Sequence, residues 1–248
     1  MHSLLDPLLP LWGMCEQEGN SVIVAAFPYL LPEEYYAGRN VSRYAVPRDY
    51  HGICGARLEK ACALLREAFP GAEFRRHCDS NVLPEVELAI KAGLGVRGKH
   101  NLLITEEYGS WVFLGEIVTE AKLIRNSEFG IRNRDGCNTC VGACPTGALG
   151  EGGFVKARCL SYISQKRGGL STEEEALLRE AGSVWGCDLC QEACPRNQNA
   201  RVAPLPEFLW EPIAHVTEST PVEGRAYAWR GEAVVKRNAR IATPFKTS

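Results

Sequence analysis

Hydrophobic and polar residues alternate along the first 120 positions in runs that are typical of an α/β domain. Residues 21–27, SVIVAAF, form a short β-branched apolar run that ends at Pro28, which predicts a buried strand. Over residues 56–69, apolar side chains recur at helical spacing, and Pro70-Gly71 closes the segment. This second pattern predicts an amphipathic helix after the first strand.

The segments that follow residue 71 continue this alternation. Residues 72–78, AEFRRHC, predict a strand that delivers Asp79 to the mouth of a loop. Residues 85–92, EVELAIKA, predict a helix with proline at its start and glycine past its end. Two more strands, joined by a polar turn, are predicted at residues 102–105 and 111–119.

Residue usage changes after Glu120 from apolar alternation to Arg, Asn, Gly and Cys. We place a boundary near residue 125 and expect a loop-rich module beyond it that is held by metal instead of by a large apolar core. A capping-box pattern at 172–175 predicts a helix that runs to about residue 181, and the tail predicts another from about 223 to 242. The expected fold class is α/β, mixed α+β, divided into residues 1–125, 126–200 and a helical tail over 201–248.

Composition and charge favour a globular protein and give no sign of a membrane-spanning segment or of an overall basic surface. The chain has 248 residues, of which 45% are hydrophobic and 23% charged, enough to bury a full core. Its net charge of −2 gives no global attraction to a polyanion, so contact with a nucleic acid needs a local basic patch. The first fifteen residues show no basic leader, and no run approaches the roughly 18 to 20 apolar residues of a spanning helix. We expect a cytoplasmic monomer without a membrane partner.

Most of the eleven cysteines are clustered at the spacing of metal ligands. Two runs, residues 137–145 and 187–195, share the form C-x2-C-x3-C-P and make an internal repeat. Bacterial two-cluster ferredoxins carry C-x2-C-x2-C-x3-C-P, in which the cysteine before proline ligates the other cluster. Thiolates suit iron because both are soft. The repeat therefore predicts two 4Fe-4S clusters.

The crossover rule divides these cysteines into two sets. One set is complete and consists of Cys144, Cys159, Cys187 and Cys190. The other consists of Cys137, Cys140 and Cys194, and it lacks a fourth thiolate because Arg134 stands where the longer run has its first cysteine. Candidates for the missing ligand are Asp135, Cys15, Cys54, Cys62, Cys78 and a non-protein ligand on a labile iron.

The cysteine motifs allow two other interpretations. Paired C-x2-C motifs also bind zinc, but the C-P ending and the duplication favour iron–sulfur clusters. Clusters with a purely structural role are a further alternative.

Residues 93–98, GLGVRG, match the dinucleotide pattern G-x-G-x-x-G, yet a helix precedes them and a strand follows, the reverse of the required order. We therefore do not expect a nicotinamide site.

A wider set of motifs resembles the epoxyqueuosine reductases, cobalamin-dependent iron–sulfur enzymes that perform the last step of queuosine synthesis on tRNA. The resemblance covers about residues 20 to 242. Its motifs are YAVPRDYH at 44–51, PGAEFR at 70–75 leading to Asp79, AGLGVRGK at 92–99, GSWVFLGE at 109–116, CPTGA at 144–148, RCLS at 158–161, GCDLCQ at 186–191 and RNARIA at 237–242.

This resemblance implies a fold, cofactors and site residues. It makes residues 1–125 a cobalamin and substrate domain and residues 126–200 a ferredoxin-like double-cluster module, with cobalamin held base-off between them. Electrons would pass from the clusters to cobalt, which acts on the epoxide carbon. Asp79 matches the family's proposed general acid. The implied cobalamin-pocket residues are Lys99, His100, Ser110, Trp111 and Ser161. The implied partners are tRNA and an external electron donor such as flavodoxin or ferredoxin.

Each of these residues also has a structural interpretation. Asp79 can cap a loop, His51 can be a buried hydrogen-bonded histidine, and Lys99 can be a solvated lysine. Ser110 and Trp111 can be a turn residue and a core aromatic.

The chain departs from the family pattern in several places. Arg134 replaces a cluster cysteine, Val96-Arg97 replaces a tryptophan and aliphatic pair, and Arg196 replaces the tryptophan of Cys-Pro-Trp-Asn. The helical-repeat extension of many members does not follow the cluster module, so we expect a short form. Basic residues of the tail can contact phosphates or form a solvated helix face.

Two alternatives to the tRNA enzyme therefore stay open. One is an iron–sulfur reductase, cobalamin-dependent or not, or an electron carrier with a non-tRNA substrate. The other is an iron–sulfur assembly or binding module without catalysis.

Overall fold

The computed structural model describes residues 1–80, 82–123, 136–150 and 152–242. The chain forms two compact units, each assembled from segments that are discontinuous in the sequence. The first unit comprises Met1–Leu30, Tyr50–Cys137 and Asn199–Glu207. The second comprises Leu31–Asp49, Asn138–Gln198 and Phe208–Ser248. The boundary predicted near residue 125 lies outside the described residues, and the three-part division stays a prediction.

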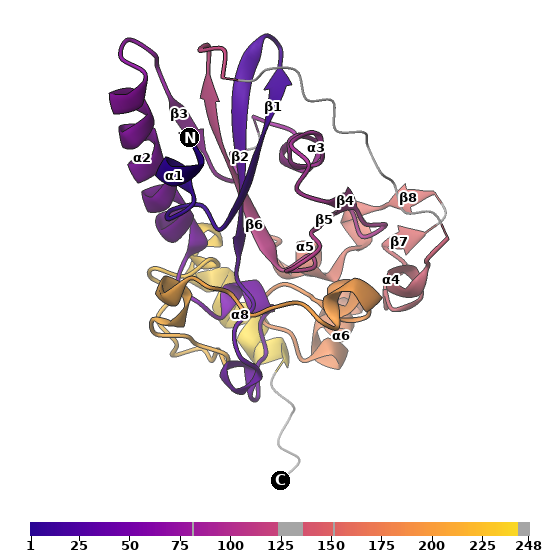
Figure 1. The fold of residues 1–248 in the computed structure, drawn as a ribbon. Coiled ribbons are helices and arrows are strands. Elements are labelled where there is room, and N and C mark those ends of the chain that lie inside the picture. Colours follow the sequence, from indigo (N-terminus) through magenta and orange to yellow (C-terminus); the bar gives the residue numbers. More distant parts are fainter. Residues whose placement is uncertain (81, 124–135, 151, 243–248) are drawn as a thin grey trace. The chain divides into compact units, whose positions relative to one another are not determined.

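The first unit is organised around a four-stranded antiparallel sheet with the strand order β1-β2-β6-β3 (Figure 1). Its strands are β1 (Leu11–Gln17), β2 (Asn20–Pro28), β3 (Arg75–His77) and β6 (Val112–Thr119). The central strand β2 is buried over nearly its whole length, as its continuous apolar run predicts. The strands predicted at 21–27 and 111–119 are thereby confirmed, and the one predicted at 72–78 is confirmed over a shorter range.

Strand β1 was not predicted from the sequence. It pairs with β2 through a two-residue turn in which Glu18 and Gly19 have φ values of 52° and 79°. Positive φ at both central residues is the geometry of a tight hairpin turn whose twist matches that of the strands. The glycine marks this turn, but the polar residues Glu16 and Gln17 obscure the apolar pattern of the strand before it.

Helices cover both faces of the sheet. Helix α3 (Glu85–Lys91), which the sequence predicts, packs through Leu88 into a core with Val24 of β2. Helix α2 (Tyr50–Ala68) begins six residues before its predicted start. A Cβ atom on Gly115 of β6 would lie 2.7 Å from Leu58 Cδ1 of α2, so glycine permits this close approach.

Shorter elements complete the first unit. They are helix α1 (His2–Leu5) and the hairpin of β4 (Val96–Arg97) with β5 (Leu103–Ile104). Strand β5 confirms part of the strand predicted at 102–105.

The second unit is built from short helices and loops. They are α4 (Thr139–Gly142), β7 (Leu149–Gly150), β8 (Gly153–Phe154), α5 (Leu160–Ser164), α6 (Thr172–Ala181), α7 (Leu189–Glu192) and α8 (Glu232–Ala242). Single-turn 3-10 helices lie at Glu33–Tyr36, Arg43–Ala45, Lys156–Arg158, Pro195–Asn197 and Ala228–Arg230. A small core joins Leu160, Leu178 and Ile241, and Cys187 packs against it.

Two predicted helix boundaries in this unit need correction. Helix α6 exists, but its N-cap is Ser171: the Ser171 hydroxyl accepts the Glu174 N–H at 3.3 Å, and the Glu174 carboxylate accepts the Ser171 N–H at 3.1 Å. The tail helix predicted from about 223 begins only at Glu232, because Gly231 has a φ of 89°, outside the helical region.

The structure also bears on membrane insertion. In the described part of the chain, no helix combines the length and the apolar character needed to cross a membrane.

Candidate functional site

The second unit brings together the four thiols that the crossover rule assigns to the complete cluster. Cys187 interacts electrostatically with Cys159 and Cys144. Cys190 interacts with Cys187 and Cys159, and also with Cys140 of the other set. Cys159 directly precedes α5 and Cys190 lies within α7, so thiols of this set up to 43 positions apart approach each other through the packing of short helices. Their role as iron ligands stays a prediction.

The surroundings of these thiols shift their pKa values in different directions. Burial raises the pKa of Cys187 to about 11 and that of Cys190 to about 12. Burial also opposes ionisation of Cys144, but the Thr146 hydroxyl and the backbone N–H groups of residues 146, 148 and 149 outweigh it and lower the pKa of that thiol. Backbone N–H donors of this kind stabilise cluster thiolates. Iron binding at Cys187 and Cys190 should therefore release protons.

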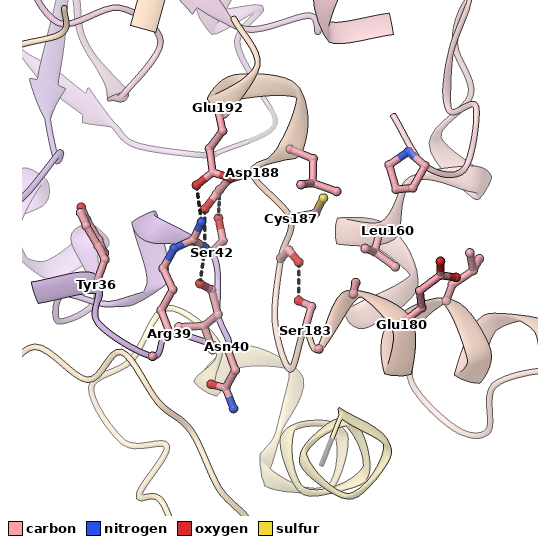
Figure 2. Close-up of a pocket in the computed structure, with 18 residues that line it drawn as sticks. Tyr36, Arg39, Asn40, Ser42, Leu160, Glu180, Ser183, Cys187, Asp188 and Glu192 are labelled. Carbon is pink, nitrogen blue, oxygen red and sulfur yellow. Dashed lines mark hydrogen bonds and ion pairs between the residues drawn. The ribbon is translucent and has the colours of Figure 1, made fainter. Parts of the chain in front are cut away.

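A cavity of about 680 Å³ reaches this group of thiols (Figure 2). Cys187 lines it, together with Pro145, Leu160 and Leu189, each of which is adjacent in sequence to a predicted ligand. Within the described ranges, no group of three or more His, Cys, Asp or Glu side chains is arranged to hold a single metal ion. A cubane spreads its four thiolates around a larger body than one ion does. The thiol set, its N–H donors and the adjacent space fit a cluster.

The incomplete set is less well defined. Cys140 and Cys194 are buried, and Cys137 is exposed. Arg134 and Asp135 lie outside the described residues. The remaining candidate ligands, Cys15, Cys54, Cys62 and Cys78, all belong to the first unit, where burial raises the pKa of Cys15 and Cys62 to about 11.

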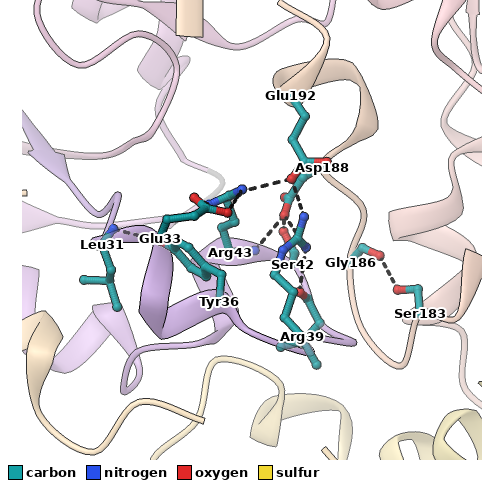
Figure 3. Close-up of polar contacts among 11 residues, drawn as sticks. Leu31, Glu33, Tyr36, Arg39, Ser42, Arg43, Ser183, Gly186, Asp188 and Glu192 are labelled. Atoms are coloured by element: carbon teal, nitrogen blue, oxygen red, sulfur yellow. Dashed lines mark hydrogen bonds and ion pairs between the residues drawn. The ribbon is translucent and has the colours of Figure 1, made fainter. Parts of the chain in front are cut away.

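The loop between Cys187 and Cys190 is anchored by the fully buried carboxylate of Asp188 (Figure 3). This carboxylate accepts the Ser42 hydroxyl, the Arg43 N–H at 2.7 Å and the Arg39 guanidinium at 3.2 Å. Burial raises the pKa of Asp188, and these three donors counter that effect. The segment at 39–43 thus fixes the backbone that presents two predicted ligands.

Two exposed carboxylates extend this anchor. Arg39 and Arg43 both pair with Glu192 of α7, and Arg43 also pairs with Glu33 at 2.9 Å (Figure 3). We refer to Glu33, Arg39, Ser42, Arg43, Asp188 and Glu192 as the loop anchor. It was not predicted, because nothing in the sequence links residues 33–43 with a loop about 150 positions later.

A second polar group surrounds Asp79 at the end of β3. The Tyr50 hydroxyl donates to Asp79 Oδ2 at 2.6 Å, and His51 Nε2 lies 3.5 Å from the same oxygen. The Asp79 N–H donates to Glu85 Oε1 at 2.8 Å, and Asp79 has a φ of 51°, in the left-handed region. The Tyr50 ring stacks on Phe113 at 3.9 Å, which fixes the hydroxyl. Three elements, α2, α3 and β6, therefore set the position of Asp79.

This arrangement determines which groups carry protons. The His51 side chain, with help from Tyr50, lowers the pKa of Asp79. Burial, followed by the nearby Asp79, raises the pKa of Glu85. Asp79 is therefore ionised at neutral pH in this state, and it needs to receive a proton before it can act as an acid.

The predicted cobalamin-pocket residues lie in both units. Ser110 and Trp111 are buried, and the Trp111 ring meets Tyr29 edge to face at 6.0 Å. His100 is also buried, which lowers its pKa to about 4, and its Nε2 has no hydrogen-bond partner among the described residues. Lys99 is exposed in the same loop, whereas Ser161 lies in α5 of the second unit. Because buried polar atoms are normally hydrogen-bonded, His100 Nε2 is the atom of this set for which a bound ligand is most expected to supply a partner.

Basic residues of the tail are engaged within the second unit. Arg225 is buried, and Arg237 donates to the carbonyl oxygen of Lys166 at 2.9 Å. Arg240 pairs with Glu218, and Lys236 pairs with Glu232 at 2.8 Å. These contacts give the tail a structural role.

Fold and site define a double-cluster iron–sulfur protein that carries an α/β unit. Residues 135–197 match the family model described as a 4Fe-4S double cluster binding domain. Residues 14–80, which include Tyr50, His51 and Asp79, match the model described as Epoxyqueuosine reductase QueG, DUF1730. The chain belongs to the epoxyqueuosine reductase family.

Curated relatives extend this assignment. The chain is 33% identical over 244 residues to the epoxyqueuosine reductase of Listeria monocytogenes, which covers 91% of the chain and 64% of the relative. It is 42% identical over 162 residues to that of Gloeobacter violaceus, covering 64% of the chain and 50% of the relative. The chain thus spans about half to two thirds of the length of the relatives it matches.

Solved structures agree with the sequence relatives. Epoxyqueuosine reductase from Streptococcus thermophilus is 29% identical, with a TM-score of 0.73 over 90% of this chain and 63% of that one. An epoxyqueuosine reductase solved with an epoxyqueuosine-modified tRNA stem loop is 26% identical, with a TM-score of 0.74 over 90% of this chain and 63% of that one.

Proposed function

We propose that this chain reduces the epoxide of epoxyqueuosine in tRNA to the alkene of queuosine. Both carbon–oxygen bonds of the epoxide break, a carbon–carbon double bond forms, and the oxygen leaves as water. The change consumes two electrons and two protons. The observation that carries the proposal is Asp79 held between Tyr50 and His51, in a family that also carries a double-cluster module.

In this proposal, cysteine thiolates hold the clusters that carry the electrons, and Asp79 delivers the proton. The thiolates of Cys144, Cys159, Cys187 and Cys190 would hold one cluster, and those of Cys137, Cys140 and Cys194 the other, with a fourth ligand still to be found. Asp79 would deliver a proton to the departing epoxide oxygen, since expelling an alkoxide without a proton is unfavourable. Tyr50 and His51 orient its carboxyl group.

Cobalamin is the second proposed cofactor. When bound, it would supply one-electron and carbon-directed chemistry that cysteine thiolates and carboxylates lack. Lys99, His100, Ser110 and Trp111 of the first unit would hold it, and the buried His100 Nε2 supports a polar partner there. The residues present fit this role, which stays a proposal.

The proposed organisation keeps the three parts expected from the sequence: a cobalamin and substrate domain, a double-cluster module and a helical tail. The proposed partners are tRNA and an external electron donor such as flavodoxin or ferredoxin. A cytoplasmic monomer is consistent with action on tRNA.

The function is tested by purifying the chain anaerobically with cobalamin and adding reductant and tRNA that carries epoxyqueuosine. We expect seven or eight irons, a bound corrinoid in the visible spectrum, and conversion of the nucleoside measured by mass spectrometry. Iron without corrinoid or conversion would indicate an electron carrier, and absence of both iron and corrinoid would overturn the proposal.

Cys159→Ala tests the ligand sets. It should remove the complete-set cluster and leave the other, which removes four of the seven or eight irons because a cubane holds four irons. Iron analysis and electron paramagnetic resonance measure this loss. Glu67→Gln is the control, because Glu67 is exposed on α2 and carries no thiol. Unchanged iron in Cys159→Ala contradicts the pairing.

A further inference from the structure

Glu116 is a fully buried carboxyl group in the middle of strand β6. Neither of its oxygens has a hydrogen-bond partner among the described residues. A charged carboxylate that is buried without a partner is strongly unfavourable, so the neutral, protonated form of this group is favoured. Burial accordingly raises its pKa to about 9.

The position of Glu116 connects it with the Asp79 site. Glu116 is paired across the sheet with Val24 of β2 and with His77 of β3, and Asp79 follows two residues after His77. Glu116 therefore lies beside the strand that leads into the catalytic loop.

Acidic and thiol groups approach Glu116 from the surrounding elements. Glu85 comes from α3, Cys78 and Asp79 come from the end of β3, and Cys15 comes from β1. Glu85 interacts with both other carboxyls, and it accepts the Asp79 N–H at 2.8 Å. The three carboxyl groups thus form one electrostatic cluster, in which Glu116 interacts more strongly with Glu85 than with Asp79.

We propose that Glu116 is the proton store of the active site and that Glu85 passes its proton to Asp79. This inference rests on the proposed function, because the epoxide reaction consumes two protons while Asp79 is ionised before turnover. In each cycle one proton passes from the Glu116 carboxyl through Glu85 to Asp79 and then to the epoxide oxygen, and the second proton that this oxygen needs to leave as water comes from solvent. Solvent then reprotonates Glu116, so atoms and charge balance over the cycle. A buried store delivers the proton without admitting water to the reacting atoms.

Glu116→Gln tests the store, because glutamine keeps the shape and removes the acidic proton. We expect turnover to fall at least about tenfold with KM unchanged. In the wild type, the rate should fall as the pH rises through about 9, where Glu116 loses its proton, and this limb should be absent from the variant. Infrared spectroscopy should show a protonated carboxyl band in the wild type at pH 7 that the variant lacks.

The pH dependence of protein stability distinguishes a proton-storing Glu116 from a purely structural one. Because the pKa of Glu116 is raised from 4.5 to about 9 in the folded protein, its contribution to stability is most favourable below pH 4.5 and is lost as the pH rises to about 9. Glu116→Gln should therefore raise the thermal unfolding midpoint at pH 8, by roughly 5 °C or more. A merely structural glutamate would lose stability on the same substitution.

Two further variants complete the test. Glu85→Gln should lower turnover and keep the infrared band, because the store stays protonated while the route is broken. Glu67→Gln, on an exposed position of α2, should behave as the wild type. Full turnover in Glu116→Gln, or a wild type without the band, overturns the inference. If the wild type does not convert the tRNA, the proposed function fails, and the band and the stability profile still decide whether Glu116 holds a proton at neutral pH.

Discussion

Asp79→Asn should keep the fold and the irons and lower turnover of the epoxide by about a hundredfold or more, the usual contribution of a general acid. Asparagine is one of the few residues that tolerate a left-handed backbone, so the φ of 51° at this position is retained. Its amide oxygen can still accept the Tyr50 hydroxyl, which donates at 2.6 Å to the carboxylate. The substitution removes the transferable proton and the carboxylate charge beside His51.

Nucleoside mass spectrometry under single-turnover conditions measures this loss, with iron content and circular dichroism as checks on folding. Tyr50→Phe is the graded comparison: it removes one hydrogen bond to Asp79 and should reduce turnover several-fold. Retained turnover in Asp79→Asn would remove Asp79 from the acid role and leave it as a residue that positions the loop.

Asp188→Ala should lower the free energy of unfolding of the second unit by about 3 to 5 kcal/mol and lead to loss of iron. The substitution leaves the Ser42 hydroxyl and the Arg43 N–H without their acceptor, and it removes the ion pair that Arg39 makes at 3.2 Å. Breaking a buried pair on one side costs far more than breaking an exposed one, because the remaining groups stay desolvated.

Denaturant unfolding and iron analysis after gel filtration test this effect. Glu33→Gln is the matched control, because Glu33 also pairs with the loop anchor through Arg43 but its side chain is 78% exposed. We expect it to cost less than about 1 kcal/mol and to keep all the iron. Equal effects of the two substitutions would show that the buried carboxylate does not anchor the cysteine loop.

Local patterns explain why much of the fold was predictable. The apolar run of β2 and the proline and glycine that flank α3 act over a few residues. The spacing of apolar residues and the flanking turn residues were therefore sufficient to predict these two elements. Strand β1 was missed because its polar residues hide the pattern, and the tail helix was extended too far because Gly231 acts as a break only once its φ of 89° is known. The Ser171 cap was displaced by one residue because Ser171 and Thr172 are both suitable N-caps, and only the hydrogen bonds distinguish them.

The sequence by itself determined the iron–sulfur character of this protein, because ligand type and spacing along a short loop are local requirements of the cluster. It also placed Asp79 at the end of a strand, and the motif around it indicated the family. Only the tertiary structure showed that Asp188 is locked by residues 39–43 and that Glu116 is buried without a partner near Asp79 and Glu85. Burial and charge interactions arise between residues far apart in the chain, and they decide which groups hold protons; no local pattern in the sequence contains that information.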